Sequence, residues 1–325
     1  MGIVVAVVGF VHFVLPQLSG LSGTLKRLAH ADPWWIAAGV AFEALSLAGY
    51  ILLFRTVFST EESQIGWRES YQINMAGTVA SKLLATAGAG GVALSVWALR
   101  ASGLEPREIA RRMITFELML YSVFALALLI CGIGLRGGVF AGRAPWALTV
   151  IPAVVSGGAI LAALSLRALP PDLEKRLAES SESPGRARRV LARLASAPSA
   201  LRDATQIGLE LIRERNLGTL GAIAYWGFDI ATLWACLHAF GSPPPPAAIV
   251  MAYFIGQLGN VLPLPGGVGG VEGGTIGALL AFGSPGGLAV LGVLAYRAIS
   301  FWLPTLPGGI AYVRLRRTVL RWRAT

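Results

Sequence analysis

Residues 260–274 read NVLPLPGGVGGVEGG, and this stretch decides how the chain folds. Its two prolines end any preceding helix, and its glycines allow backbone angles that other residues avoid. A helix that restarts near Glu272 would present N–H groups without partners in its first turn. Such a helix start attracts anions, and inside a membrane a phosphate or carboxylate headgroup is the natural candidate. A tightly packed hairpin with no ligand is the alternative.

The composition excludes a soluble protein. Of the 325 residues, 55% are apolar and only 14% are charged, against about 25% charged in an ordinary soluble domain. The two cysteines lie in apolar stretches and the three histidines are scattered, which excludes a disulfide scaffold and gives no metal-ligand spacing. We therefore expect an all-α polytopic membrane protein with no metal and no cofactor.

Apolar stretches of about 20 residues mark the membrane spans. Four stretches have this length and few charges, and a fifth is interrupted by Pro304 and Pro307. A short sixth span is expected over residues 2–15. The five longer stretches are residues 34–58, 113–135, 146–167, 217–240 and 286–313.

Two further stretches, residues 67–101 and 248–283, are too short or too rich in glycine to be plain spans. Each predicts a helix, a glycine-rich break and a shorter helix, as in a re-entrant hairpin. Shifted by 179 positions, residues 77–92 and 256–271 agree at six of 16 places. We expect an inverted-topology repeat in a single membrane domain, 1–325, with repeat one over about 34–167 and repeat two over about 217–313.

The positive charges predict the orientation. Arginines crowd residues 100–112, the polar insert 168–216 and the tail 314–325, so all three are expected in the cytoplasm, together with the N-terminus. Because the Lys and Arg residues lie between apolar runs, the net charge of +10 favours an anionic membrane surface over nucleic acid as the partner. The expected location is the cell membrane, and the insert is expected to be an amphipathic cytosolic segment.

Residues Pro263 to Gly273 and the later stretch 296–304, YRAISFWLP, resemble the closing half of the lysylphosphatidylglycerol synthase transmembrane family, which is flippase-like. The shared pattern is a Pro-Gly-Gly-x-Gly-x-x-Glu hairpin followed by a span with Tyr-Arg and an aromatic-Pro ending. In two respects this chain departs from the pattern. The first hairpin lacks the proline and the acidic residue, and Gly270 replaces a usual aliphatic residue. The soluble aminoacyl-transferase domain that full synthases carry does not fit in this chain.

Ionisable residues at membrane depth are candidates for function because burying a charge there is costly. The resemblance and the opposite charges predict contact between Glu272 and Arg297, either at a headgroup site or as a structural ion pair. Lys82, Glu117 and Asp229 are expected to be coupling or structural charges. Glu117 and Asp229 could relay protons, or they could pair with Lys82 and Arg112. Glu43 is a further candidate of this kind, with snorkelling to the surface as the alternative for Glu43 and Arg55. Trp226 is expected to lie at a membrane interface. The predicted substrate-binding set is Asn260, Pro265, Gly266, Gly267, Gly269, Glu272 and Arg297.

The resemblance implies a membrane lipid translocase that moves an anionic or phosphate-containing lipid, either a phospholipid or a lipid-linked substrate, between leaflets. The alternative is an accessory subunit that serves a partner aminoacyl- or glycosyl-transferase. No arrangement of side chains in the sequence suggests catalysis, so an enzyme is not expected. A structural or assembly factor is the third class.

Overall fold

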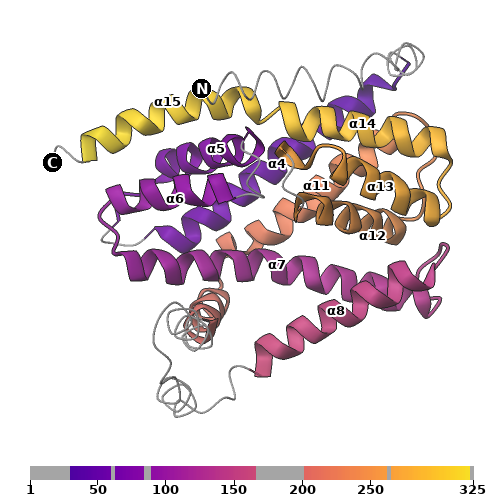
Figure 1. Cartoon of the computed structure of the whole chain (residues 1–325), viewed down its shortest axis with the longest axis horizontal. Helices are drawn as coiled ribbons and strands as arrows, with labels where there is room; N and C mark the ends of the chain where they lie inside the picture. The colour runs from indigo at the N-terminus through magenta and orange to yellow at the C-terminus, as the bar shows by residue number, and fades with distance from the viewer. Residues whose placement is uncertain (1–29, 60–62, 84–88, 166–200, 262–264, 323–325) are drawn as a thin grey trace, which may run out of the picture.

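The computed structural model describes residues 30–59, 63–83, 89–165, 201–261 and 265–322, and these residues form helices and short turns without a strand. The expected all-α class is therefore confirmed. The helices are α4 (Pro33–Phe58), α5 (Trp67–Leu83), α6 (Ala89–Ala101), α7 (Pro106–Arg136), α8 (Trp146–Ser165), α11 (Gly221–His238), α12 (Pro246–Gln257), α13 (Gly270–Ala281), α14 (Gly286–Trp302) and α15 (Thr305–Trp322), with 3-10 turns η2 (Leu217–Leu220), η3 (Leu258–Val261) and η4 (Pro265–Gly267) (Figure 1).

Helices α4 and α11 pack side by side along their length at the centre of the molecule (Figure 1). Ser46 of α4 donates to the Tyr225 carbonyl at 2.9 Å. Early residues of α4 meet late residues of α11, as where Thr232 donates to the Gly39 carbonyl, so the helices run antiparallel. Small residues let the backbones approach closely, because a Cβ at Gly49 would lie 2.8 Å from the Ala224 Cβ.

Two pairs of short helices flank the central pair of α4 and α11. Helices α5 and α6 pack together, and so do α12 and α13. Figure 1 shows α5 and α6 toward one end of the molecule and α12 and α13 toward the other. Both predicted arrangements of helix, break and helix are present, although the first break, 84–88, and residues 262–264 of the second lie outside the described residues.

The longer helices enclose these elements. Helix α8 packs against α7, while α15 continues the direction of α14 and lies along α5 (Figure 1). The break between α14 and α15 falls at Leu303 and Pro304, as the prolines predict. Residues 201–213 of the expected insert are helical, and Thr115 of α7 donates to the Ala204 carbonyl, so this part of the insert packs on the helical bundle.

Five helical segments are long and apolar enough to span a membrane: Pro33–Phe58, Pro106–Arg136, Trp146–Ser165, Leu217–His238 and the combined Gly286–Trp322. They match the five longer predicted spans. The sixth expected span, residues 2–15, lies outside the described residues. Large apolar side chains such as Val154, Leu161 and Ile310 are exposed on these helices, as contact with lipid requires. The chain is a multi-pass membrane protein.

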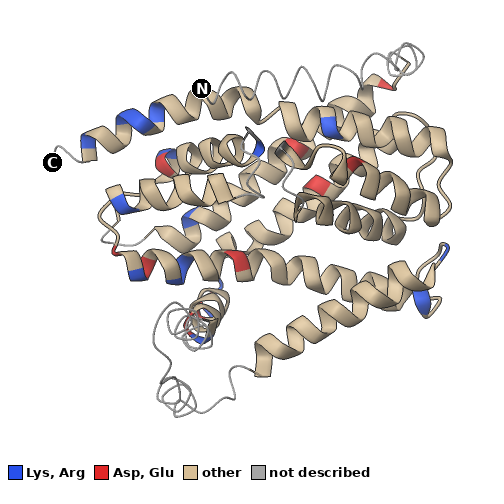
Figure 2. Cartoon of the chain, in the orientation of Figure 1, with Lys and Arg blue, Asp and Glu red and all other residues tan. Residues whose placement is uncertain are grey.

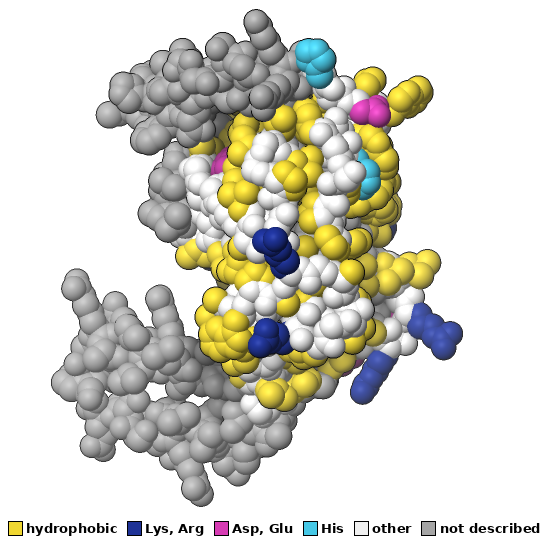
Figure 3. All heavy atoms as spheres, turned by 90° about the vertical axis from the view of Figure 1, so that its right-hand side faces the viewer, with side chains coloured by type: hydrophobic (Ala, Val, Ile, Leu, Met, Phe, Trp, Pro, Cys, Tyr) yellow, Lys and Arg dark blue, Asp and Glu magenta, His cyan; other side chains and the backbone are white. Residues whose placement is uncertain are grey.

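Charged side chains are unevenly distributed along the molecule. Figure 2 shows Lys and Arg gathered at one end, on the C-terminal half of α15 and around the junction between α6 and α7. Figure 3 shows the opposite end, where apolar side chains predominate and charged ones are few. The structure thus gathers the arginines of 100–112 and of the α15 part of the tail at a single end.

The close packing of α4 against α11 can be tested with two matched glycine variants. Gly49→Ala places a methyl group against the backbone of α11, and such overpacking costs about 1–3 kcal/mol. Gly227→Ala adds the same group where no heavy atom lies within 4 Å, so it should be neutral or slightly stabilising. Thermal unfolding of the purified protein in detergent measures both. Equal melting temperatures for the two variants would contradict the close contact.

Candidate functional site

A cavity of about 1020 Å³ lies where the two pairs of short helices approach each other, and α4, α7, α11 and α14 supply the rest of its wall. Seven residues predicted from the sequence line it. Two of them come from α5 and α7, one from α11, three from the second hairpin and one from α14. They are Lys82, Glu117, Asp229, Asn260, Gly266, Gly267 and Arg297.

The other three predicted residues belong to the same hairpin turn but are not part of the cavity wall. Pro265 begins η4, Gly269 precedes α13, and Glu272 lies in the first turn of α13. The glycines are required by the backbone, because Gly266, Gly267 and Gly269 have φ angles of 59°, 66° and 86°, which side chains disfavour.

Asn260 occupies the space beside Gly267. Its Nδ2 donates to Oε1 of Gln257 at 2.5 Å, and a Cβ at Gly267 would collide with its Oδ1. The turn is therefore closed on this side by an amide side chain that also faces the cavity.

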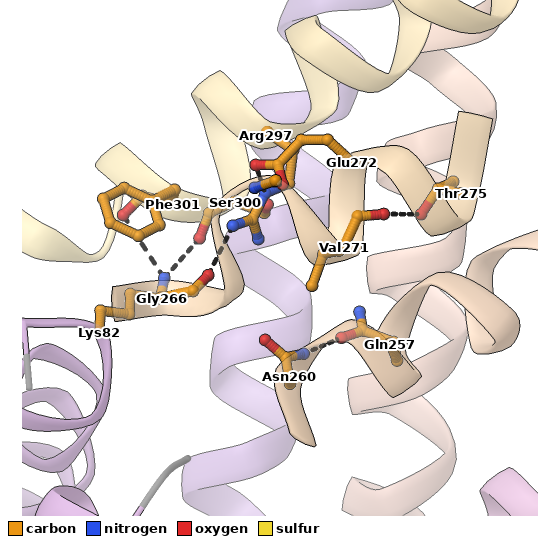
Figure 4. A network of polar contacts seen from close by, with 11 residues as sticks. Lys82, Gln257, Asn260, Gly266, Val271, Glu272, Thr275, Arg297, Ser300 and Phe301 are labelled. Atoms are coloured by element: carbon orange, nitrogen blue, oxygen red, sulfur yellow. Dashed lines mark hydrogen bonds and ion pairs between the residues drawn. The ribbon is translucent and has the colours of Figure 1, made fainter. Parts of the chain in front are cut away.

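Glu272 and Arg297 are in contact, as predicted (Figure 4). Arg297 Nε donates to Glu272 Oε1 at 2.7 Å, and Arg297 Nη2 donates to the Gly266 carbonyl at 2.7 Å. The other carboxylate oxygen of Glu272 accepts the Gly269 N–H at 2.7 Å. Glu272 therefore caps its own helix, so an anion could use this N–H group only by displacing that carboxylate.

Lys82 connects the first hairpin to the end of α14 (Figure 4). Its Nζ donates to the Ser300 carbonyl at 2.6 Å and lies 3.4 Å from the Phe301 carbonyl. In a regular helix the Ser300 carbonyl would accept the N–H of residue 304, but Pro304 has none. Lys82 supplies the missing donor. The Phe301 ring lies near both cations, with its centroid 5.4 Å from Lys82 Nζ and 5.6 Å from Arg297 Cζ.

Two carboxyl groups face each other across the contact between α4 and α11. Glu43 is 4% exposed and Asp229 is 7% exposed, and their side chains lie within hydrogen-bonding range of each other. Tyr253 donates to Asp229 Oδ2 at 2.5 Å. The alternative in which Glu43 snorkels to the surface is wrong, because Glu43 lies in the middle of α4 and lines the cavity.

Glu117 lines the cavity from α7, but it does not pair with Arg112. Arg112 instead bonds to Glu108 and to the Val57 carbonyl. Trp226 is not an interface residue, because it is 7% exposed, lines the cavity and donates to the Leu120 carbonyl at 2.8 Å. Trp34, in contrast, is exposed at the start of α4.

Some residues that line the cavity are also exposed on the outer surface, so the cavity is open to the surroundings. Most of the exposed lining residues are apolar or aromatic, among them Val92 of α6, Tyr121 of α7, and Leu258 and Val261 of η3, the last 73% exposed. Asn260 is an exposed polar residue of the same lining. The site therefore combines a charged inner wall with a mouth that is mainly apolar. Among the described residues there is no group of three or more His, Cys, Asp or Glu that could hold a metal.

The ion pair predicts a measurable loss of stability. Its charged side chains are only 13% and 16% exposed, and removing one partner of a buried pair costs about 3–5 kcal/mol. Arg297→Gln should therefore lower the melting temperature strongly. Arg111→Gln, which breaks a pair within α7 that is more exposed, should cost at most about 1 kcal/mol. A similar loss in both variants would show that the contact with Glu272 contributes little.

The comparisons agree with the resemblance in the hairpin and in α14. The family model described as "Lysylphosphatidylglycerol synthase TM region" matches residues 1–308. Two proteins of Methanothermobacter thermautotrophicus, both named "UPF0104 membrane protein", are 30% identical over 106 residues and 35% identical over 101 residues. These matches cover 31% and 29% of this chain, and the chain spans only 30% of the length of each relative. The chain belongs to the lysylphosphatidylglycerol synthase TM region family.

Proposed function

We propose that the protein is a lipid translocase of the cell membrane, which moves a phosphate-containing lipid between leaflets without making or breaking bonds in it. The shape of the cavity carries this proposal. Its inner wall holds Lys82, Arg297 and Asp229, whereas its mouth is lined by exposed apolar side chains such as Val261. An amphiphile fits this arrangement if its headgroup enters while its acyl chains stay in the lipid.

Lys82 is the best placed group to bind a phosphate. An ammonium group has three N–H donors, and the Ser300 and Phe301 carbonyls take two of them. The third donor can bind a headgroup oxygen, and Arg297 adds a second positive charge on the same wall. A charge-assisted hydrogen bond of this kind is about twice as strong as a neutral one.

The helix positions support an inverted-topology repeat. Helices α5 and α12 begin 179 residues apart, at Trp67 and Pro246, and the pairs α6/α13 and α7/α14 begin within two residues of the same offset. Ser46 and Tyr225, which are hydrogen-bonded between α4 and α11, are also 179 residues apart. Because the equivalent helices α4 and α11 run antiparallel, the two repeats would be related by a two-fold axis in the membrane plane, as in many transporters.

In this arrangement α5–α6 and α12–α13 are re-entrant hairpins that enter from opposite sides. Helix α5 contacts η4 beside the cavity. There Lys82 of α5 donates to the Ser300 carbonyl, and Arg297 donates to the Gly266 carbonyl of η4 (Figure 4). Rocking of one repeat against the other would open the cavity first to one leaflet and then to the other.

A second candidate function comes from the family description, which names a region of a synthase. In this candidate, the protein is an accessory subunit that presents a lipid to a partner aminoacyl- or glycosyl-transferase. The same cavity would then bind the lipid without moving it across the membrane.

The arginine-rich end in Figure 2 is proposed to face the cytoplasm. The test uses single cysteines in a background that lacks Cys131 and Cys236. Ser242→Cys, in an exposed loop after α11, should react with a membrane-impermeant thiol reagent in intact cells, whereas Arg316→Cys on α15 should react only after permeabilisation. The reverse pattern would invert the proposed orientation.

Lipid movement is tested in phosphatidylcholine proteoliposomes that carry fluorescent phosphatidylglycerol, with chemical quenching of the outer leaflet as the measurement. Lys82→Gln should slow translocation about tenfold or more, because a hydrogen bond to a charged group contributes about 1.5–3 kcal/mol. Lys82→Arg should retain more activity. The matched control is Arg316→Gln, which removes an exposed positive charge on α15 that does not line the cavity.

Two results would count against this function. If the parent protein moves the lipid no faster than protein-free vesicles do, the accessory role is favoured. If Lys82→Gln has the melting temperature of the parent and translocates at the parent rate, the headgroup does not bind at Lys82.

A further inference from the structure

The carboxyl groups of Glu43 and Asp229 have unsatisfied oxygens. Glu43 Oε2 and Asp229 Oδ1 are buried and have no hydrogen-bond partner among the described residues. Ionised carboxylates only accept hydrogen bonds, so two of them in direct range of each other, as here, repel. A single proton between the two groups removes this repulsion and supplies the missing donor.

The surrounding charges set the expected number of protons. The charged groups that act on the pair are Lys82 of α5 and Arg297 of α14, and Arg297 is bonded to Glu272. If both members of the pair were ionised, three carboxylates would face two cations. With one proton on the pair, the cluster is neutral, which the low dielectric of a membrane interior favours. The other titratable groups facing the pair are Tyr225 and Cys236 of α11, Tyr253 of α12 and Tyr296 of α14.

An anionic headgroup disturbs this balance. A phosphodiester bound at Lys82 and Arg297 adds one negative charge to the same wall of the cavity. Uptake of one more proton by the pair restores neutrality. By thermodynamic linkage, the proton then strengthens headgroup binding as much as the headgroup strengthens proton binding.

We propose that Glu43 and Asp229 form a proton-binding site, which holds one proton when the cavity is empty and takes up a second when a phosphodiester headgroup binds. This inference rests on the proposed function for the identity of the ligand. It adds the coupling ion, because a pair that holds two protons with the lipid and one proton without it carries one proton across together with each lipid. The proton comes from water on the side to which the cavity is open and is released to water on the other side.

The first measurement does not depend on lipid movement. Infrared spectra of the purified protein in phosphatidylcholine nanodiscs should show a stretching band of a protonated carboxyl group at neutral pH, shifted in heavy water. The band should be lost in Glu43→Gln, which removes the need for a shared proton, and kept in Glu117→Gln, which removes a cavity carboxyl on α7. Absence of the band from the parent, or its persistence in Glu43→Gln, would overturn the shared proton.

The second measurement uses dihexanoylphosphatidylglycerol as the probe. Its addition to the parent in weakly buffered solution should take up about one proton per bound probe, and its affinity should rise by up to about tenfold per unit decrease in pH, the limit for one coupled proton. Glu43→Gln and Asp229→Asn should lose this uptake, whereas Arg316→Gln, which changes an exposed residue outside the cavity, should keep it. Melting temperatures identify variants that fail to fold, and the parent alone still decides whether uptake occurs.

The outcomes separate the two proposals. Binding of the probe without proton uptake, or with proton release as a cationic headgroup would cause, overturns the coupling. Uptake that depends on sodium instead of pH would assign the site to a metal cation and overturn it as well. If the probe does not bind and no lipid moves, the proposed function fails, while the infrared band still decides whether the pair holds a proton.

Discussion

A helix that breaks inside a membrane leaves backbone groups without partners, and no water is available there to satisfy them. In this site, charged side chains supply the missing hydrogen bonds to the backbone. Lys82 donates to the carbonyl that Pro304 leaves free, Arg297 donates to the carbonyl of Gly266, and Glu272 accepts the N–H of Gly269. The charges are therefore held in place by the same breaks that create the cavity, which means that the site and the fold depend on one set of bonds.

This arrangement has a cost for ligand binding. A lipid headgroup must share Lys82 with two backbone carbonyls and compete with Glu272 for Arg297. Binding is then weak enough to reverse, which a carrier requires, because a headgroup held too tightly would not be released. The charges of this cluster also balance. When the pair of Glu43 and Asp229 carries one proton, its remaining negative charge and that of Glu272 match the positive charges of Lys82 and Arg297.

The sequence predicts the helices well because length and hydropathy are local properties. It also predicts the contact of Glu272 with Arg297, because the family pattern contains both residues. It does not predict the role of Glu43, since α4 is apolar on all sides and its sequence does not indicate which face is buried. Lys82 and Ser300 are 218 residues apart, so only the folded chain brings them together. Pro304 was nevertheless a usable signal, because it identifies Ser300 as a carbonyl that needs a donor.

The contact between α4 and α11 has a consequence for the evolutionary origin of the chain. In the proposed repeat, α4 packs against its own equivalent, α11, and Ser46 bonds to its equivalent residue, Tyr225. A two-fold contact of this kind is self-complementary, so a half-length ancestor would already possess the surface needed to pair with a second copy of itself. Two such copies would have to insert in opposite directions. On the proposed repeat, gene duplication and fusion into one polypeptide, with arginines gathered at one end (Figure 2), would fix the orientation of each half and remove the need for dual insertion.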